Sequence, residues 1–140
     1  MLNQEAVQQL RIPPSAIEDV ARSEQQELER RERLYRAGQP PLDVRGHTVI
    51  VVDDGLATGS TMLAAVKALR ARQARRIVVA VPVAAADTCD AMRAEADVVV
   101  CATTPRPFQA VGLWYRDFEQ TTDDEVRRCL ARAHEALASS

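Results

Sequence analysis

The sequence has few aromatic residues and few histidines, and its basic residues do not outnumber its acidic ones. Aromatic side chains make up 4% of its 140 residues, so any core must be built from aliphatic side chains. Two histidines and three widely separated cysteines provide no metal-ligand spacing. The net charge of −2 offers no basic surface of the kind that nucleic acid requires. These scarcities argue against a zinc domain and against a nucleic-acid-binding protein.

No segment has the length of a membrane span. The longest apolar run, 77–86, is interrupted by Pro82 and falls well short of the ~20 residues that a spanning helix needs. The first five residues, Met-Leu-Asn-Gln-Glu, do not open a signal peptide. Cys101 lies in an apolar run, which is typical of a buried, reduced thiol. We therefore expect no membrane partner and a reducing, cytoplasmic location.

A charged helix is expected near the N-terminus. Ser15 and Glu18 have the spacing of a capping box, which predicts a helix from about Ala16 to about Ala37. Three glutamate–arginine pairs at i,i+4 support this helix: Glu27–Arg31, Glu29–Arg33 and Glu32–Arg36. Its apolar seam is narrow, which indicates a solvated helix packed along one edge. A role in closing over a ligand, or in a dimer contact, is the alternative.

The middle of the chain alternates apolar β-branched runs with amphipathic stretches. Apolar residues on both faces of a run are typical of a parallel strand that is covered on both sides. Such alternation predicts right-handed crossovers and a three-layer α/β fold with a mainly parallel sheet. The expected strands are Thr48–Asp53, Ile77–Val83 and Asp97–Cys101, and the expected helices are 60–72 and 87–95.

The pattern is less regular after the third strand. Residues 103–108 read as a loop, and Val111–Phe118 as a further strand or hairpin. Thr122 and Glu125 form a second capping box, which predicts a final helix to about Ala138. We expect one domain, with a charged helix and linker in 1–47, a sheet core in 48–118 and a C-terminal helix in 119–140.

Polar and small residues follow the first expected strand. Asp53 and Asp54 stand at its end, where their carboxylates can accept hydrogen bonds from two adjacent hydroxyls. The next helix begins near Ser60, so its free backbone N–H groups favour a phosphate. Gly59 lets the backbone approach an anion closely, and the hydroxyls of Thr58 and its neighbours add donors. Carboxylates that bind two adjacent hydroxyls, next to a turn that binds phosphate, are what the recognition of a ribose 5-phosphate requires.

The stretch Val51–Thr61 resembles the PRPP-binding motif of type I phosphoribosyltransferases, two acidic residues followed by a Thr-Gly-x-Thr turn. The resemblance implies that Asp53 and Asp54 hold the ribose 2′- and 3′-hydroxyls. It also implies that the 5-phosphate is wrapped by Ala57, Thr58, Gly59, Ser60 and Thr61. Three further stretches resemble a bacterial branch of predicted phosphoribosyltransferases: Glu27–Glu32, Trp114–Phe118 and Thr121–Val126.

The family's reaction transfers the phosphoribosyl group of PRPP to a nucleophile, usually a ring nitrogen, and releases pyrophosphate. The resemblance implies magnesium as cofactor, bound through PRPP, with Asp53 and Asp54 as candidate ligands. No catalytic residue is identified. Ala57 stands where the 6-oxopurine enzymes of the family carry an aspartate, which argues against hypoxanthine or guanine as acceptor. Trp114 and Tyr115 are candidates for stacking on a base, or for a place in the core or an interface.

The family's pyrophosphate loop has no counterpart upstream of Thr48, so the chain resembles the C-terminal portion of a family member. A non-catalytic module that senses PRPP or a nucleotide, or a truncated remnant, is therefore the alternative function. A response-regulator receiver is disfavoured, because it would need a lysine late in the sheet, and the single lysine, Lys67, lies on the helix immediately after the loop. A structural turn without a ligand would not need two carboxylates. Without a neighbour, the strand Thr48–Asp53 has an open edge. The helix Arg22–Arg36 or a later strand near Val111 could cover it, but we expect a homodimer that buries this strand or the N-terminal helix.

Overall fold

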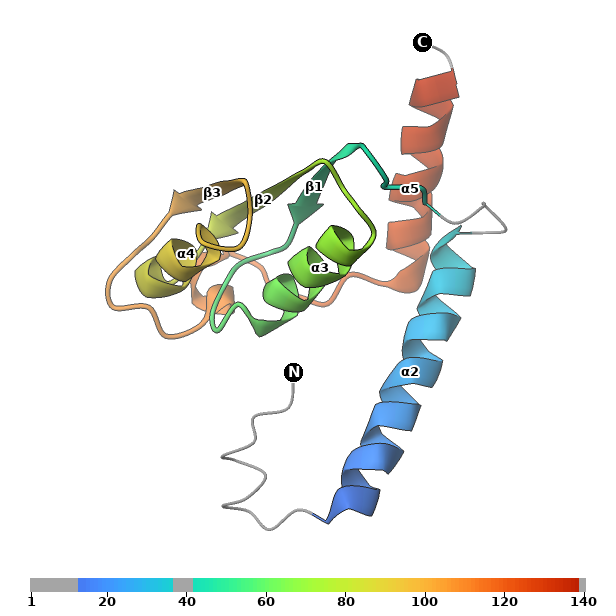
Figure 1. Ribbon diagram of the computed structural model, residues 1–140, viewed down its shortest axis with the longest axis horizontal. Coiled ribbons are helices and arrows are strands. Elements are labelled where there is room, and N and C mark those ends of the chain that lie inside the picture. The colour runs from blue at the N-terminus through green and yellow to red at the C-terminus, as the bar shows by residue number, and fades with distance from the viewer. Residues whose placement is uncertain (1–12, 37–41, 139–140) are drawn as a thin grey trace. The chain divides into compact units, whose positions relative to one another are not determined.

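The computed structural model describes residues 13–36 and 42–138 (Figure 1). The chain divides into two compact units. Unit 1 comprises Leu42–Phe118, and unit 2 is formed by segments on either side of it, within 2–41 and 119–140. Among the described residues, no helix is both long enough and apolar enough to cross a membrane.

Unit 1 is built on a parallel sheet. Its three strands are β1 (Thr48–Val52), β2 (Arg76–Val83) and β3 (Val98–Thr103). They lie in the order β1-β2-β3, and both neighbouring pairs are parallel. In the register, Val49 lies opposite Ile77, and Val79 lies opposite Val99. The predicted α/β fold with a parallel sheet is confirmed, and the strand limits differ from the predicted ones by one or two residues.

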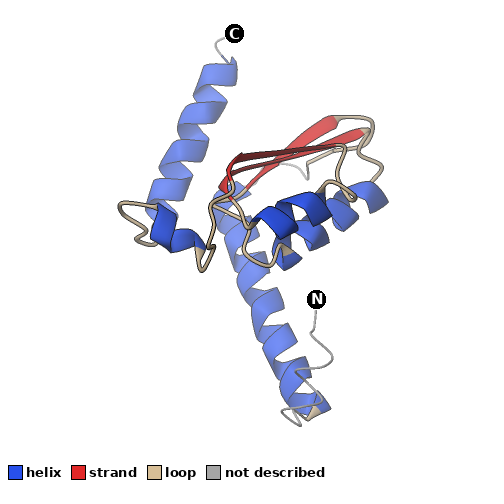
Figure 2. Ribbon diagram, turned by 90° about the vertical axis from the view of Figure 1, so that its left-hand side faces the viewer, coloured by secondary structure: helices blue, strands red, loops and turns tan. Residues whose placement is uncertain are grey.

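Two helices cover one face of this sheet, α3 (Ser60–Ala71) and α4 (Ala86–Met92) (Figure 2). The order of the strands explains why both lie on one side. Consecutive right-handed crossovers that step in the same direction place their helices on the same face. The core between the layers is aliphatic, as the composition required, and its members include Met62, Val66, Ile77, Val79, Val81 and Met92.

The opposite face of the sheet carries exposed apolar side chains. Ile50 and Val52 of β1 are 64% and 71% exposed, and Val100 of β3 is 51% exposed. Side chains alternate between the faces of a strand, so these residues point away from α3 and α4. The elements of residues 42–118 supply no helix over this face. An apolar surface of this kind marks a place where another element or molecule can pack.

Cys101 is not the free thiol that its apolar run suggested. It forms a disulfide with Cys89 of α4, and the two Cα atoms are 6.7 Å apart. The crossover from β2 to β3 packs α4 against the sheet beside β3, which brings together two cysteines separated by 12 residues. Cys129 is a free, exposed thiol. The expected reduced state was one reason to predict a cytoplasmic location, and the disulfide removes that reason.

The segment after β3 does not form the expected strand or hairpin. Val111–Trp114 is a short 3-10 helix, named η1. Its apolar residues lack the strict alternation of a strand, and tertiary contacts hold the segment instead. A Cβ added to Gly55 would lie 2.7 Å from Cγ1 of Val111, so the Val111 side chain packs directly against Gly55. The position of η1 is therefore coupled to the loop that follows β1.

The described residues of unit 2, 13–36 and 119–138, form two helices, α2 (Pro14–Arg36) and α5 (Asp123–Ala138). The helix α2 starts earlier than the predicted capping box allowed, so Ser15 lies inside its first turn. Proline suits the first position of a helix, because its missing N–H would have no partner there. At α5 the predicted capping box is confirmed. The Thr122 N–H donates to Glu125 Oε2 at 2.8 Å, and the Glu125 N–H donates to Thr122 Oγ1 at 3.3 Å.

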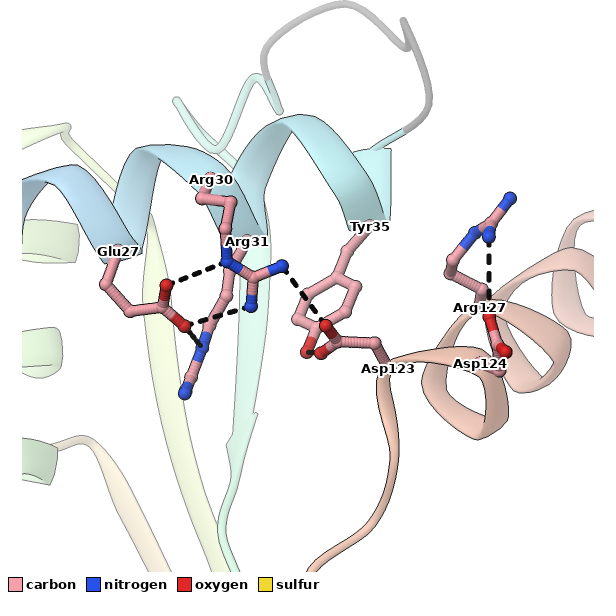
Figure 3. A network of polar contacts seen from close by, with 7 residues as sticks. All are labelled: Glu27, Arg30, Arg31, Tyr35, Asp123, Asp124 and Arg127. Atoms are coloured by element: carbon pink, nitrogen blue, oxygen red, sulfur yellow. Dashed lines mark hydrogen bonds and ion pairs between the residues drawn. The ribbon is translucent and has the colours of Figure 1, made fainter.

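A polar network joins the two helices of unit 2 (Figure 3). The Glu27 carboxylate accepts hydrogen bonds from Arg30 and Arg31, in each case from Nε at 2.7 Å. The Asp123 carboxylate accepts from the Tyr35 hydroxyl at 2.5 Å and from Arg30 at 3.1 Å. These donors lower the pKa of Glu27 from 4.5 to about 2 and hold the pKa of Asp123 below its usual value. The predicted Glu27–Arg31 pair is thus confirmed.

Candidate functional site

The loop between β1 and α3 begins with two exposed aspartates at the carboxyl end of the sheet. Asp53 Oδ1 accepts the Asp54 backbone N–H at 2.9 Å, and the chain bends at Asp54. The Asp54 carbonyl accepts the Tyr115 hydroxyl at 2.6 Å. Neither hydrogen bond uses the Asp54 carboxylate. Ligands of open parallel sheets bind at this edge, so the placement suits both carboxylates for contact with a ligand.

The centre of the loop is fixed to the end of β2. The Leu56 N–H donates to the Val83 carbonyl at 3.0 Å, and the Ala85 N–H donates to the Leu56 carbonyl at 2.9 Å. The Leu56 side chain is 2% exposed and belongs to the core. At Gly55 a Cβ would meet the Val83 carbonyl oxygen at 2.9 Å. The backbone thus passes close to β2 at a residue without a side chain, and the loop is held at its middle.

The second half of the loop turns into α3. Gly59 has φ +71°, a left-handed conformation that glycine adopts without the strain of a Cβ. Thr58 Oγ1 lies 3.3 Å from Ser60 Oγ, and the Ser60 N–H points to Thr58 Oγ1 at 3.5 Å. The first N–H groups of a helix have no intrahelical partner and attract anions. Thr58, Ser60 and Thr61 are exposed, so their donors are accessible.

A residue outside the motif also contacts this turn. Thr88 of α4 donates its hydroxyl hydrogen to the Ala57 carbonyl at 2.6 Å. A Cβ on Gly59 would meet Thr88 Cγ2 at 2.8 Å and Met92 Cε at 3.3 Å. Sequence reasoning missed Thr88, because it lies 31 residues from its partner and no local pattern marks it. A threonine in the first turn of the helix after β2 was the only signal available.

Trp114 and Tyr115, the two candidates for stacking on a base, lie in different environments. Tyr115 is partly buried, its ring centroid lies 5.1 Å from that of Phe118, and its hydroxyl is bonded to the Asp54 carbonyl. Trp114 is 47% exposed. Tyr115 therefore stabilises the loop at Asp54, and Trp114 is the residue of the two that a ligand can reach.

A groove of about 350 Å³ lies at the carboxyl ends of β2 and β3, lined by Ala85, Ala86, Asp87, Pro105, Arg106 and Phe108. It shares Ala85 with the hydrogen bonds that fix the loop. A groove of about 850 Å³ in unit 2 contains no residue of the loop. No group of three or more metal-ligating side chains occurs in the described parts of the chain. Asp53 and Asp54 still fit magnesium, which prefers one or two carboxylates together with oxygens of a phosphorylated substrate.

Comparison with known proteins gives consistent matches. The sequence model of the family described as "Phosphoribosyl transferase domain" matches residues 1–116. The Mycobacterium tuberculosis protein named "Putative phosphoribosyl transferase Rv0571c" is 40% identical over 140 residues, which is 100% of this chain and 32% of that protein. The ribose-phosphate pyrophosphokinase of Methanopyrus kandleri is 38% identical over 76 residues, covering 51% of this chain and 26% of that protein.

A solved structure, the crystal structure of TT1426 from Thermus thermophilus, matches this fold with a TM-score of 0.72. The two sequences are 37% identical, and the match covers 88% of this chain and 59% of the other. The chain spans about a third of the length of the mycobacterial relative, 32%. The parallel sheet of unit 1 agrees with the structural match. The chain belongs to the phosphoribosyl transferase domain family.

Proposed function

We propose that the loop Asp53–Thr61 binds the phosphoribosyl part of PRPP or of ribose 5-phosphate. The observation that carries this proposal is one continuous loop with an acidic pair at the strand end and a left-handed glycine at the start of α3. The Asp53 and Asp54 carboxylates would accept the 2′- and 3′-hydroxyls. The backbone of Ala57, Thr58, Gly59, Ser60 and Thr61 would surround the 5-phosphate. Because Leu56 is fixed between these halves, the loop is pre-organised, which lowers the entropic cost of binding.

We further propose that the whole protein transfers the phosphoribosyl group to a nitrogenous acceptor and releases pyrophosphate. In such a reaction the ribose approaches an oxocarbenium ion, so carboxylates held near it stabilise developing positive charge. Magnesium, bound through PRPP and by Asp53 and Asp54, would neutralise the pyrophosphate as it leaves. Since Ala57 supplies no acid beside the turn, the acceptor is expected to be other than hypoxanthine or guanine. A highly charged sugar phosphate does not cross a bilayer unaided, so the proposal includes a cytoplasmic location.

Calorimetric titration with PRPP, with and without magnesium, tests binding. We expect magnesium to strengthen the binding of PRPP. Changing Asp53→Asn together with Asp54→Asn should weaken PRPP binding at least about tenfold, because the variant loses both negative charges beside the ribose. The chain offers a matched control in its other Asp-Asp pair, Asp123→Asn with Asp124→Asn, which should leave the affinity unchanged. No heat from the unmodified protein at millimolar PRPP would overturn the proposal.

Pyrophosphate release with a panel of bases distinguishes the two candidate functions. Release with one base, abolished in the Asp53→Asn, Asp54→Asn variant, supports transfer. PRPP binding without release from any base supports a sensing module instead. The chain spans 32% of its mycobacterial relative, so the acceptor site of a whole protein need not lie within it, and a test on this chain alone can show binding without transfer.

A homodimer is part of the proposal. Within the described residues, β1 pairs with β2 alone, and its other edge presents unpaired backbone groups beside exposed Ile50 and Val52. A second copy could cover this edge through a symmetric contact. Light scattering should give twice the monomer mass, and Val52→Lys should give the monomer. Val100→Lys, an exposed valine on β3, is the matched control. A monomeric unmodified protein at micromolar concentration would exclude the dimer.

A further inference from the structure

Thr88 contacts the loop on both sides of Thr58, although it belongs to a different helix. Its hydroxyl donates to the Ala57 carbonyl, which precedes Thr58, at 2.6 Å. Its methyl group occupies the space beside the Gly59 Cα, which follows Thr58, and would lie 2.8 Å from an added Cβ. One side chain thus meets two successive parts of the turn. That arrangement restricts the orientation of the peptide units around Thr58.

The hydrogen bond has a geometric consequence for the phosphate end of the loop. A peptide unit is planar and trans, so its C=O and N–H point in opposite directions. The Ala57 carbonyl shares its peptide unit with the Thr58 N–H. Because the carbonyl is directed toward α4, the Thr58 N–H is directed away from α4. Rotation of this peptide unit would require the bond to Thr88 to break.

The helix that carries Thr88 is itself firmly held. Cys89, the next residue, is 1% exposed and forms the disulfide with Cys101 of β3. Met92, one turn later, is 4% exposed, and its Cε would lie 3.3 Å from a Cβ added to Gly59. Thr88 therefore connects a rigid part of the core to an exposed turn. A residue in such a place can transmit the rigidity of the core to the loop.

We propose that Thr88 is a positioning residue that sets the affinity of the loop for the 5-phosphate. It acts through the Ala57 carbonyl and the Gly59 backbone, by holding the Thr58 N–H in the direction that a phosphate needs. This inference rests on the proposed function of the loop. Thr88 lies outside the motif Val51–Thr61 by which the loop resembles its family, so the motif alone would not identify it.

The test measures the affinity for ribose 5-phosphate and for inorganic phosphate by calorimetry in four proteins. Thr88→Val removes the hydroxyl and keeps the shape, and it should weaken both affinities about tenfold, the worth of one hydrogen bond. Thr88→Ser keeps the hydroxyl and should retain the affinity to within about threefold. Thr104→Val makes the same change at an exposed threonine of unit 1 and should match the unmodified protein.

The outcomes separate the two proposals. If the unmodified protein binds neither phosphate compound, the proposed function and this inference are both overturned. If it binds them and Thr88→Val binds equally well, the inference alone is overturned. A purely structural role would lower the unfolding midpoint and would weaken Thr88→Val and Thr88→Ser alike. Loss in Thr88→Val with rescue by Thr88→Ser, at an unchanged midpoint, supports positioning.

Discussion

Different kinds of interaction stabilise the inside of each of the two units of the chain. The buried apolar side chains of the described residues all belong to unit 1, between Val44 and Ala96. In unit 2, α2 and α5 are joined by contacts of exposed or half-exposed polar groups around Asp123. Burial of apolar area is the larger stabilising term, whereas exposed ion pairs contribute little. The precise geometry of a ligand site is therefore expected in unit 1, where the loop Asp53–Thr61 lies.

The largest effect should come from the core of unit 1. Ile77 is fully buried at 0% exposure, so Ile77→Ala should lower the free energy of unfolding by about 2–5 kcal/mol. Ile50 on the adjacent strand is the matched control, because it is 64% exposed. Ile50→Ala should cost about 1 kcal/mol or less. Denaturant titration of both variants at a concentration where the chain is monomeric measures the difference, and a large loss in Ile50→Ala there would show that this side chain is covered within the chain itself.

The disulfide should have the next largest effect. Cys101→Ser opens a loop of 12 residues between α4 and β3 and should lower the free energy of unfolding by about 2–3 kcal/mol. Cys129→Ser, at an exposed free thiol, is the control and should be close to neutral. Thiol titration of the denatured protein should find one free thiol without reductant and three after reduction. Three thiols without reductant would contradict the disulfide.

Loss of the network in unit 2 should have a smaller effect. Asp123→Ala removes the acceptor of both Tyr35 and Arg30, but these groups are accessible to water, which can replace the lost partner. The unfolding midpoint of unit 1 should not change. Hydrogen exchange in the first turn of α5 should become faster. If Asp123→Ala destabilised the core as strongly as Ile77→Ala, the two units would not be energetically separate.

Acid should produce the smallest change, and its sign follows from Glu27. The pKa of Glu27 falls from 4.5 to about 2 because Arg30 and Arg31 stabilise the carboxylate in the folded chain. The stabilisation is fully present above pH 4.5 and declines as pH falls toward 2. Helix content should therefore decrease over this range, and less so in Glu27→Gln. An NMR titration that placed the pKa of Glu27 near 4.5 would show that the ion pairs are absent in solution.

Much of unit 1 could be predicted because its signals are local. The β-branched run before Asp53 and the amphipathic stretch after Gly59 specify a strand, a turn and a helix from neighbouring residues alone. Thr122 and Glu125 predicted the start of α5 for the same reason, since their hydrogen bonds join residues three apart. Ser15 and Glu18 have the same spacing without starting a helix there, because Pro13 and Pro14 placed the first turn earlier.

The sequence by itself determined the three strands and the helices α2 to α5, but not η1. It also determined the chemistry of the loop: two carboxylates, a left-handed glycine and a helix start within nine residues, 53–61. Tertiary structure alone decided that α3 and α4 share one face, that Cys89 meets Cys101, and that the loop is braced from outside. Tyr115 reaches Asp54 across 61 residues, and Thr88 reaches Ala57 across 31. Periodicity reports only which residues lie near one another along a helix or strand, so contacts of such long range arise only when the crossovers bring separate elements together.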